Sequence, residues 1–133
     1  MSQLLDAAFG KSPGMTLTRG LSYWSANPMS VIPISTANDG ATITFDLSLS
    51  SWWQVTLGGN RTLALSNVQV GQQFSIILIQ GSGGQTVTWF SSIKWPSGSA
   101  PTLSSSAAAI DIFTIKCYGT ATYYGFTVGQ AMA

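Results

Sequence analysis

The sequence predicts an all-β protein: an antiparallel β-sandwich of jelly-roll type with about eight strands, preceded by an extended N-terminal arm. Short stretches of alternating apolar and polar residues follow one another from Val31 onward, and turns rich in Gly, Ser and Pro separate them. After residue 10 no stretch has a helical period. We therefore expect the arm to span residues 1–35 and the sandwich to span residues 36–133.

The N-terminal arm has too few regular signals to fold by itself. Residues 2–9 can form a short helix, and Gly20, Pro28 and Pro33 interrupt the chain that follows. The arm also carries apolar side chains that it cannot bury against itself. We predict that these form an interface, made by Leu4, Leu5, Phe9, Leu17, Leu21, Tyr23, Trp24 and Met29. Either the arm orders on a partner's surface, or it wraps its own domain.

The first strands of the sandwich are predicted at 42–47, 52–57 and 61–65. In the stretch 52–57 the alternation places Trp53 in the core and Trp52 on the opposite face, as a further interface residue. A Gly-Gly-Asn turn at 58–60 joins the second and third strands, so we expect them to form a hairpin.

The later strands begin with residues 74–79, which are apolar on both faces and typical of a central strand. Residues 81–84 are rich in glycine and predict a second hairpin, with a strand at 86–90 that buries Trp89. A long excursion follows at 91–106. Strands at 110–117 and 122–128, joined by a turn at 118–120, complete the set.

Composition argues against several functional classes. Charged residues make up 7% of the chain and the net charge is +1, whereas about 25% is usual, so no field steers the protein to nucleic acid or to anionic lipid. No run approaches the roughly 20 apolar residues of a membrane span. The start lacks a signal-peptide pattern, and Cys117 is the single cysteine. We expect assembly in a cytoplasm, with much of the near-neutral surface covered by other subunits.

Catalytic and metal-binding chemistry find little support in the residues. Histidine is absent, and the only side-chain carboxylates are Asp6, Asp39, Asp46 and Asp111. We therefore expect no enzyme, no cofactor and no metal site. Asp111 lies between two isoleucines and needs a partner if it is buried. We predict that Asp111 either forms a structural ion pair with Arg61, with Lys94 as the other candidate cation, or caps the preceding loop; contact with a ligand is the alternative.

Two further residues have competing interpretations. Trp95, beside Pro96 in the long excursion, is suited either to plugging one end of the sandwich or to stacking on a sugar. Cys117 lies in an apolar strand and is expected to be an inert core residue.

A series of short segments in the second half of the chain resembles a small β domain that recurs in tail fibres, tail tips and other virion proteins of tailed bacteriophages. The segments are GNRTL at 59–63, VGQ at 70–72, IQGSGGQTVTW at 79–89, KWPSG at 94–98, APTLS at 100–104 and AID at 109–111. Each is weak alone, and their joint order is the specific feature. The first third of the chain does not match.

The resemblance implies a structural role in a virion. A short chain with an N-terminal arm and without a stalk is similar to capsid decoration (cement) proteins, so we expect a homotrimer that binds the major capsid protein non-covalently on the capsid surface. The alternative is a receptor- or carbohydrate-binding domain of a tail fibre or tail tip, with host surface glycan as partner. Neither version calls for nucleic acid or membrane as a partner.

Overall fold

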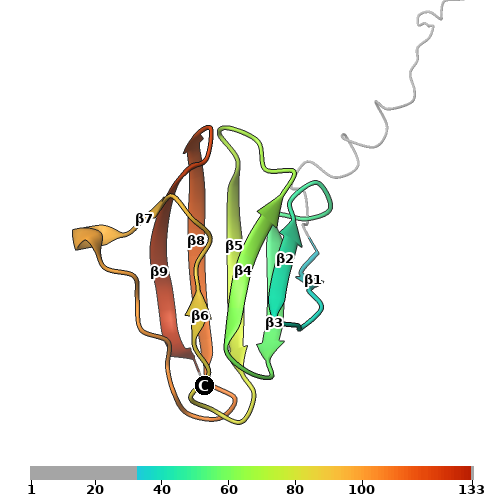
Figure 1. Ribbon diagram of the computed structural model, residues 1–133, viewed down its shortest axis with the longest axis vertical. Helices are drawn as coiled ribbons and strands as arrows, with labels where there is room; N and C mark the ends of the chain where they lie inside the picture. Colours follow the sequence, from blue (N-terminus) through green and yellow to red (C-terminus); the bar gives the residue numbers. More distant parts are fainter. Residues whose placement is uncertain (1–32, 133) are drawn as a thin grey trace, which may run out of the picture. The chain divides into compact units, whose positions relative to one another are not determined.

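The computed structural model describes residues 33–132, and this part of the chain is all-β, as predicted (Figure 1). Its only helical element is one 3₁₀ turn, η1 (Pro96–Gly98). The strands are β1 (Ser35–Thr36), β2 (Thr42–Asp46), β3 (Trp52–Leu57), β4 (Arg61–Ser66), β5 (Gln73–Gln80), β6 (Val87–Thr88), β7 (Ile93–Lys94), β8 (Ile110–Gly119) and β9 (Thr122–Met132). β1 begins at Ser35, the last residue of the predicted arm.

The first six strands wind back and forth between two sheets. The large sheet has the order β1-β3-β5-β8-β9-β7, and the small sheet has the order β2-β4-β6. Each new strand lies parallel to the strand one turn earlier, so that β3 pairs with β1 and β4 pairs with β2. Parallel neighbours need a crossover connection, and here a strand of the opposite sheet provides it. This winding is the arrangement of a short β-solenoid.

The last two strands close the large sheet as an antiparallel hairpin. β8 pairs antiparallel with β5 and with β9, and β7 adds to the outer edge of β9 in parallel. The turn predicted at 118–120 is therefore confirmed. Figure 1 shows the β8–β9 hairpin beside β5, with the small sheet in front of the large one.

The predicted antiparallel pairing is wrong for most of the molecule. Five of the seven strand pairs are parallel, and a jelly roll is not supported. The two hairpins predicted around residues 58–60 and 81–84 do not exist, because β3 and β5 belong to the large sheet whereas β4 and β6 belong to the small sheet. A strand with one apolar face buries the same residues whether the next strand pairs with it in the same sheet or packs against it in the opposite sheet. Alternation therefore does not distinguish the two cases.

The core lies between the two sheets. Inward-facing residues alternate along β2 and β3 as predicted, and Phe45 of the small sheet contacts Trp53 of the large sheet with ring centroids 6.1 Å apart. The fully buried members are Phe45, Phe74, Phe113, Ile43, Leu57, Leu63, Ile76, Leu78, Ile115 and Val55. An aromatic cluster packs in the core beside β8 and β9: Trp89, Phe90, Trp95, Phe113 and Tyr123. Trp53 thus takes the core position that alternation predicts, whereas Trp89 packs against the core and stays only partly buried.

Polar side chains hold the loops that cross between the sheets. The buried amide of Gln80 donates to the backbone oxygen of Gln85 at 2.8 Å and accepts from its backbone N–H at 2.9 Å. Gly81 passes so close to β3 that an added Cβ would lie 2.5 Å from the backbone oxygen of Leu57. The glycine-rich loop therefore serves a close crossing between the sheets, where the sequence indicated a hairpin turn. Within residues 33–132, no helix has the length and apolar character needed to cross a lipid bilayer.

Candidate interaction surface

The face of the large sheet that points away from the core is the most unusual surface of the described chain. On β3, β5, β8 and β9 the residues that alternate with the core residues form three cross-strand rows, which we call the outer face. The rows are Trp52–Ser75–Thr114–Phe126, Gln54–Ile77–Ile112–Gly129 and Thr56–Ile79–Ile110–Met132. A solvated sheet face normally carries polar residues.

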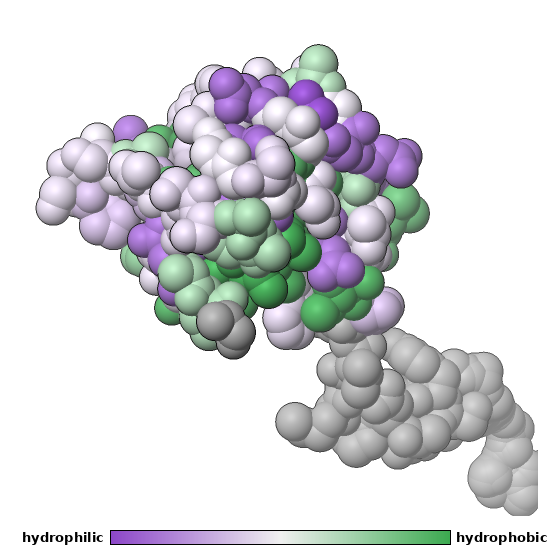
Figure 2. Space-filling model, turned by 90° about the horizontal axis from the view of Figure 1, so that it is seen from below, coloured by the Kyte–Doolittle hydropathy of each residue, from purple (hydrophilic) through white to green (hydrophobic). Residues whose placement is uncertain are grey.

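Isoleucines occupy the centre of this outer face. Ile77 pairs with Ile112, and Ile79 pairs with Ile110. Ile77 is only 8% exposed although it lies outside the core cluster, because its neighbours in the sheet surround it. At the margins, Trp52 is 39% exposed and Met132 is 48% exposed. Figure 2, viewed from the end of the molecule where β3 and β5 finish, shows hydrophobic residues gathered on one side.

The outer face has no carboxylate among the residues that the structure describes. Asp39 precedes β2, Asp46 ends β2 in the small sheet, and Asp111 faces the core. The two lysines of the large sheet lie beyond the isoleucines. Lys116 on β8 and Lys94 on β7 both pair with Tyr124 on β9, and we call these three residues the Lys–Tyr–Lys row.

A shallow cavity of about 390 Å³ lies beside this row. It forms where β7 ends, because the chain leaves the edge of β9 at Pro96. Its walls are Lys94, Trp95, Pro96, Tyr124, Gly125 and Phe126. Trp95 is 9% exposed and packs against Trp89 with ring centroids 4.9 Å apart, so it plugs the end of the core as one of its two interpretations predicts. Among the described residues, its indole Nε1 has no hydrogen-bond partner.

The predicted interface residues are only partly placed by the structure. Trp52 lies at the margin of the outer face, as its alternation with Trp53 predicts, and its role as an interface residue stays a prediction. The remaining predicted interface residues lie outside the described range: Leu4, Leu5, Phe9, Leu17, Leu21, Tyr23, Trp24 and Met29.

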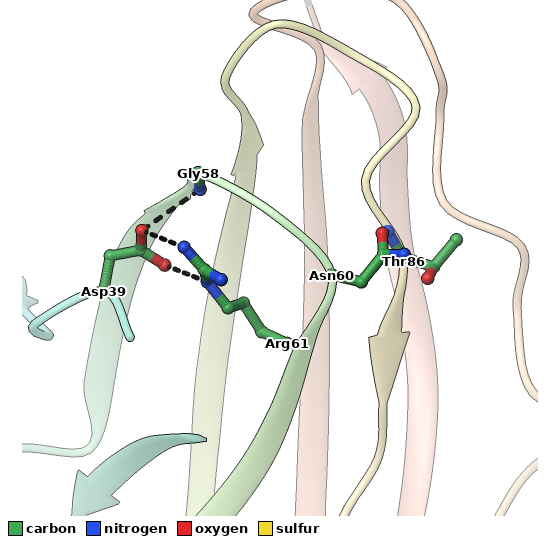
Figure 3. Close-up of polar contacts among 5 residues, drawn as sticks. All are labelled: Asp39, Gly58, Asn60, Arg61 and Thr86. Carbon is green, nitrogen blue, oxygen red and sulfur yellow. Dashed lines mark hydrogen bonds and ion pairs between the residues drawn. The ribbon is translucent and has the colours of Figure 1, made fainter. Parts of the chain in front are cut away.

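The predicted ion pair between Arg61 and Asp111 is wrong. Arg61 binds Asp39 instead, with Nε and one terminal nitrogen 2.7 and 2.8 Å from the two carboxylate oxygens (Figure 3). The hydrogen bonds from Arg61 lower the pKa of Asp39. Asp39 also accepts the Gly58 N–H, and nearby Asn60 accepts the Thr86 N–H. The sequence does not indicate that the turn at 38–40 folds beside the loop at 58–60, because the two segments are far apart along the chain.

Asp111 is satisfied by hydrogen bonds from the backbone. Its carboxylate accepts the N–H of Ser104 at 2.7 Å and the N–H of Ala131 at 2.9 Å, and Gln130 donates to it at 3.4 Å. Burial by itself raises the pKa of Asp111, but these hydrogen bonds outweigh it and leave the pKa below its usual value. Asp111 therefore fixes the end of β9 and caps the loop before β8, as the second of its structural interpretations predicts.

The cysteine and the side chains that could bind a metal are the remaining reactive groups in the described range. The Cys117 thiol is buried, as predicted, and donates a weak hydrogen bond to the Gly119 oxygen at 3.4 Å. Within residues 33–132, no group of three or more metal-ligating side chains comes together. Comparison of the chain with family models, with curated proteins and with solved structures found no match.

Sequence reasoning missed the Lys–Tyr–Lys row. The outward direction of Lys116 could be read from its place between Ile115 and Cys117, which face the core. The position of Lys94 could not, because a parallel strand of two residues at the edge of β9 leaves no pattern in the sequence.

Proposed function

We propose that this chain is a structural assembly protein, and specifically a phage capsid decoration protein that binds the major capsid protein on the capsid surface. The observation that carries the proposal is the apolar, carboxylate-free outer face of the large sheet. An apolar sheet face rimmed by polar residues is typical of a protein–protein contact. The choice of a virion, assembled in the host cytoplasm, rests on the resemblance of the segments between residues 59 and 111.

The area of the outer face can be compared with the area that a stable protein–protein interface buries. Four strands about 4.8 Å apart, each rising about 3.3 Å per residue, give roughly 500 Å² of projected area over the eight residues of β5. A stable interface buries about 800 Å² on each partner. The outer face supplies more than half of that area, and the apolar N-terminal arm supplies further contact in the proposed complex. Association as a homotrimer is the second part of the proposal.

The test measures retention on capsids. Purified chain is sized by light scattering, mixed with capsids that lack it, and sedimented. We expect trimers that bind saturably, and Ile112→Lys should weaken binding at least tenfold because it places a charge in the centre of the outer face. Thr44→Lys is the matched control, since it adds the same charge at an exposed position on the small sheet.

Two outcomes would contradict the proposal. Equal retention of Ile112→Lys and the wild-type chain would remove the outer face from the contact. Trimers that ignore capsids altogether would favour the alternative, a receptor-binding domain of a tail fibre or tail tip. Deletion of residues 1–30 tests the arm separately, because undiminished retention would show that the arm does not anchor the protein.

A further inference from the structure

The described part of the chain contains two lysines with no acidic partner. Arg61, the other described cation, forms its ion pair with Asp39. Lys94 and Lys116 are both exposed, and within residues 33–132 neither forms a salt bridge. Both pair with Tyr124, so all three side chains project from the same face of the large sheet. The fold therefore brings two otherwise isolated positive charges to one site.

The spacing of this row fits an extended anionic ligand. Lys94 and Lys116 lie on the two strands that flank β9, so their Cα atoms are about 10 Å apart across two strand spacings. With flexible side chains at that separation, each ammonium group can meet a different acidic group of one chain-like molecule that passes over Tyr124.

Aromatic side chains provide a stacking surface between and beside the lysines. Tyr118 packs against Tyr124 with ring centroids 5.4 Å apart, which restricts the Tyr124 ring. Phe126, two residues further along β9, is 44% exposed. The cavity of about 390 Å³ continues this surface between Tyr124, Phe126 and the Trp95–Pro96 wall. Gly125 lets the Trp95 ring that walls the cavity lie directly against β9, because a Cβ there would lie 2.6 Å from that ring.

We propose that the Lys–Tyr–Lys row and the adjoining cavity bind an acidic oligosaccharide. The two ammonium groups pair with acidic groups of the sugar chain, and the apolar face of a sugar ring packs on Tyr124 and Phe126. Charge complementarity selects an anionic ligand, because the described part of this face holds two cations and no carboxylate. Nucleic acid fits less well, since affinity for phosphate chains grows with the number of neutralised phosphates and only two cations are present.

This inference goes beyond the proposed assembly function and does not depend on it. The row crosses β7, β9 and β8 at Lys94, Tyr124 and Lys116, whereas the isoleucines are on β5 and at the start of β8. The two surfaces share Phe126 at their border, so a protein that attaches through the isoleucines leaves both lysines and Tyr124 for a polysaccharide.

The experiment measures binding of tetragalacturonate to the full chain by calorimetry and by tryptophan fluorescence, since Trp95 lines the cavity. We expect saturable binding that weakens with added salt, and no binding of the neutral maltotetraose. Lys94→Gln and Lys116→Gln should each weaken binding about two- to fivefold, as expected for one exposed charge pair. Tyr124→Ala should weaken it at least as much, because the stacking surface is lost.

Matched controls separate site effects from general effects. Thr44→Glu lowers the net charge by one, as Lys94→Gln does, but on the small sheet, so binding should persist. Leu49→Ala removes an apolar side chain that is 72% exposed and lies outside the row and the cavity. Thermal melting of every variant confirms folding. The proposal is overturned if tetragalacturonate fails to bind, if the lysine variants bind it like the wild-type chain, or if polyglutamate or a single-stranded oligonucleotide binds more tightly.

Discussion

The two sheets bury the same kind of residue on their inner faces, but their outer faces differ. On the small sheet, rows such as Thr42–Thr62–Thr88 and Thr44–Ala64 face outward. On the large sheet the corresponding positions hold Ile77, Ile79, Ile110 and Ile112. Both compositions favour strands, because threonine and isoleucine are β-branched. Threonines suit permanent contact with water better than isoleucines do, and the proposal that a partner covers the large sheet rests on this difference.

Neighbouring residues on one strand offer the sharpest test of this comparison. Ile76 faces the core with 0% exposure, whereas Ile77 faces outward. Ile76→Ala should lower the free energy of unfolding by about 2–5 kcal/mol, because it leaves a closed cavity. Ile77→Ala should cost less, about 2 kcal/mol for the three carbons removed, because the space that it leaves on the outer face opens to water and adds no closed cavity. Urea denaturation of dilute, monomeric chain measures both values; equal losses would mean that the outer face is part of the core.

The inner face of the large sheet holds one charge, Asp111, and removing it should have the next largest effect. Asp111→Asn should cost about 2–3 kcal/mol, because its amide nitrogen would face one of the two backbone N–H donors. The folded-state pKa of Asp111 lies below the ordinary value, so its contribution is complete above about pH 4. That contribution is lost as the pH falls through the lowered pKa. Acid titration of stability checks this, and an equally steep acid loss in the variant would contradict it.

The edge of the large sheet at β9 should be less sensitive. Gly125→Ala puts a Cβ against the Trp95 ring, at 2.6 to 2.9 Å from three ring atoms. The indole has to shift, which should cost about 1–2 kcal/mol of stability and change the shape of the cavity beside the Lys–Tyr–Lys row. Tryptophan fluorescence and thermal melting follow the two effects together. Gly119→Ala is the control on the same hairpin, since its nearest neighbour would be 3.9 Å away; equal changes in both variants would be inconsistent with a local clash.

The small-sheet side should show the weakest electrostatic effect. Asp39→Asn removes the ion pair with Arg61, and both side chains are partly exposed. Such pairs contribute little and are screened by salt. The hydrogen bonds from Arg61 lower the pKa of Asp39, so its small contribution is present above the unfolded pKa and is lost in acid. We expect a slight fall in melting temperature that shrinks in high salt; a fall as large as that of Asp111→Asn would contradict this ranking.

Local patterns in the sequence predict most strands but not their partners. Alternation predicts a strand at 52–57, where β3 lies, and the apolar run at 74–79 lies within β5. The strands β1 and β7 have two residues each and show no alternation. Partners depend on contacts between residues far apart in the sequence, such as Ser35 with Trp53 and Lys94 with Tyr124.

In the candidate site, too, local sequence patterns predict some features, and others depend on contacts between residues far apart in the sequence. The exposure of Trp52 follows from alternation, because the adjacent Trp53 faces the core. The inward direction of Asp111 follows as well, because Phe113, two residues later on the same strand, faces the core. The partner of Arg61 and the Lys–Tyr–Lys row depend on which loops and edges meet after folding. Ile77 and Ile79 belong to the apolar run at 74–79, which predicts a strand buried on both sides, because no sequence pattern distinguishes a face covered by its own chain from a face that docks on a partner.

The winding between the sheets also sets an order in which the molecule should form. The β8–β9 hairpin is the one pairing between strands that are adjacent along the chain. Every other pairing first has to close a long loop, which slows its formation. The hairpin is therefore the natural nucleus, onto which β5, β3 and β1 add in turn. Amide protons should exchange most slowly in β8 and fastest in β1, so the described end nearest the N-terminus is the first to open.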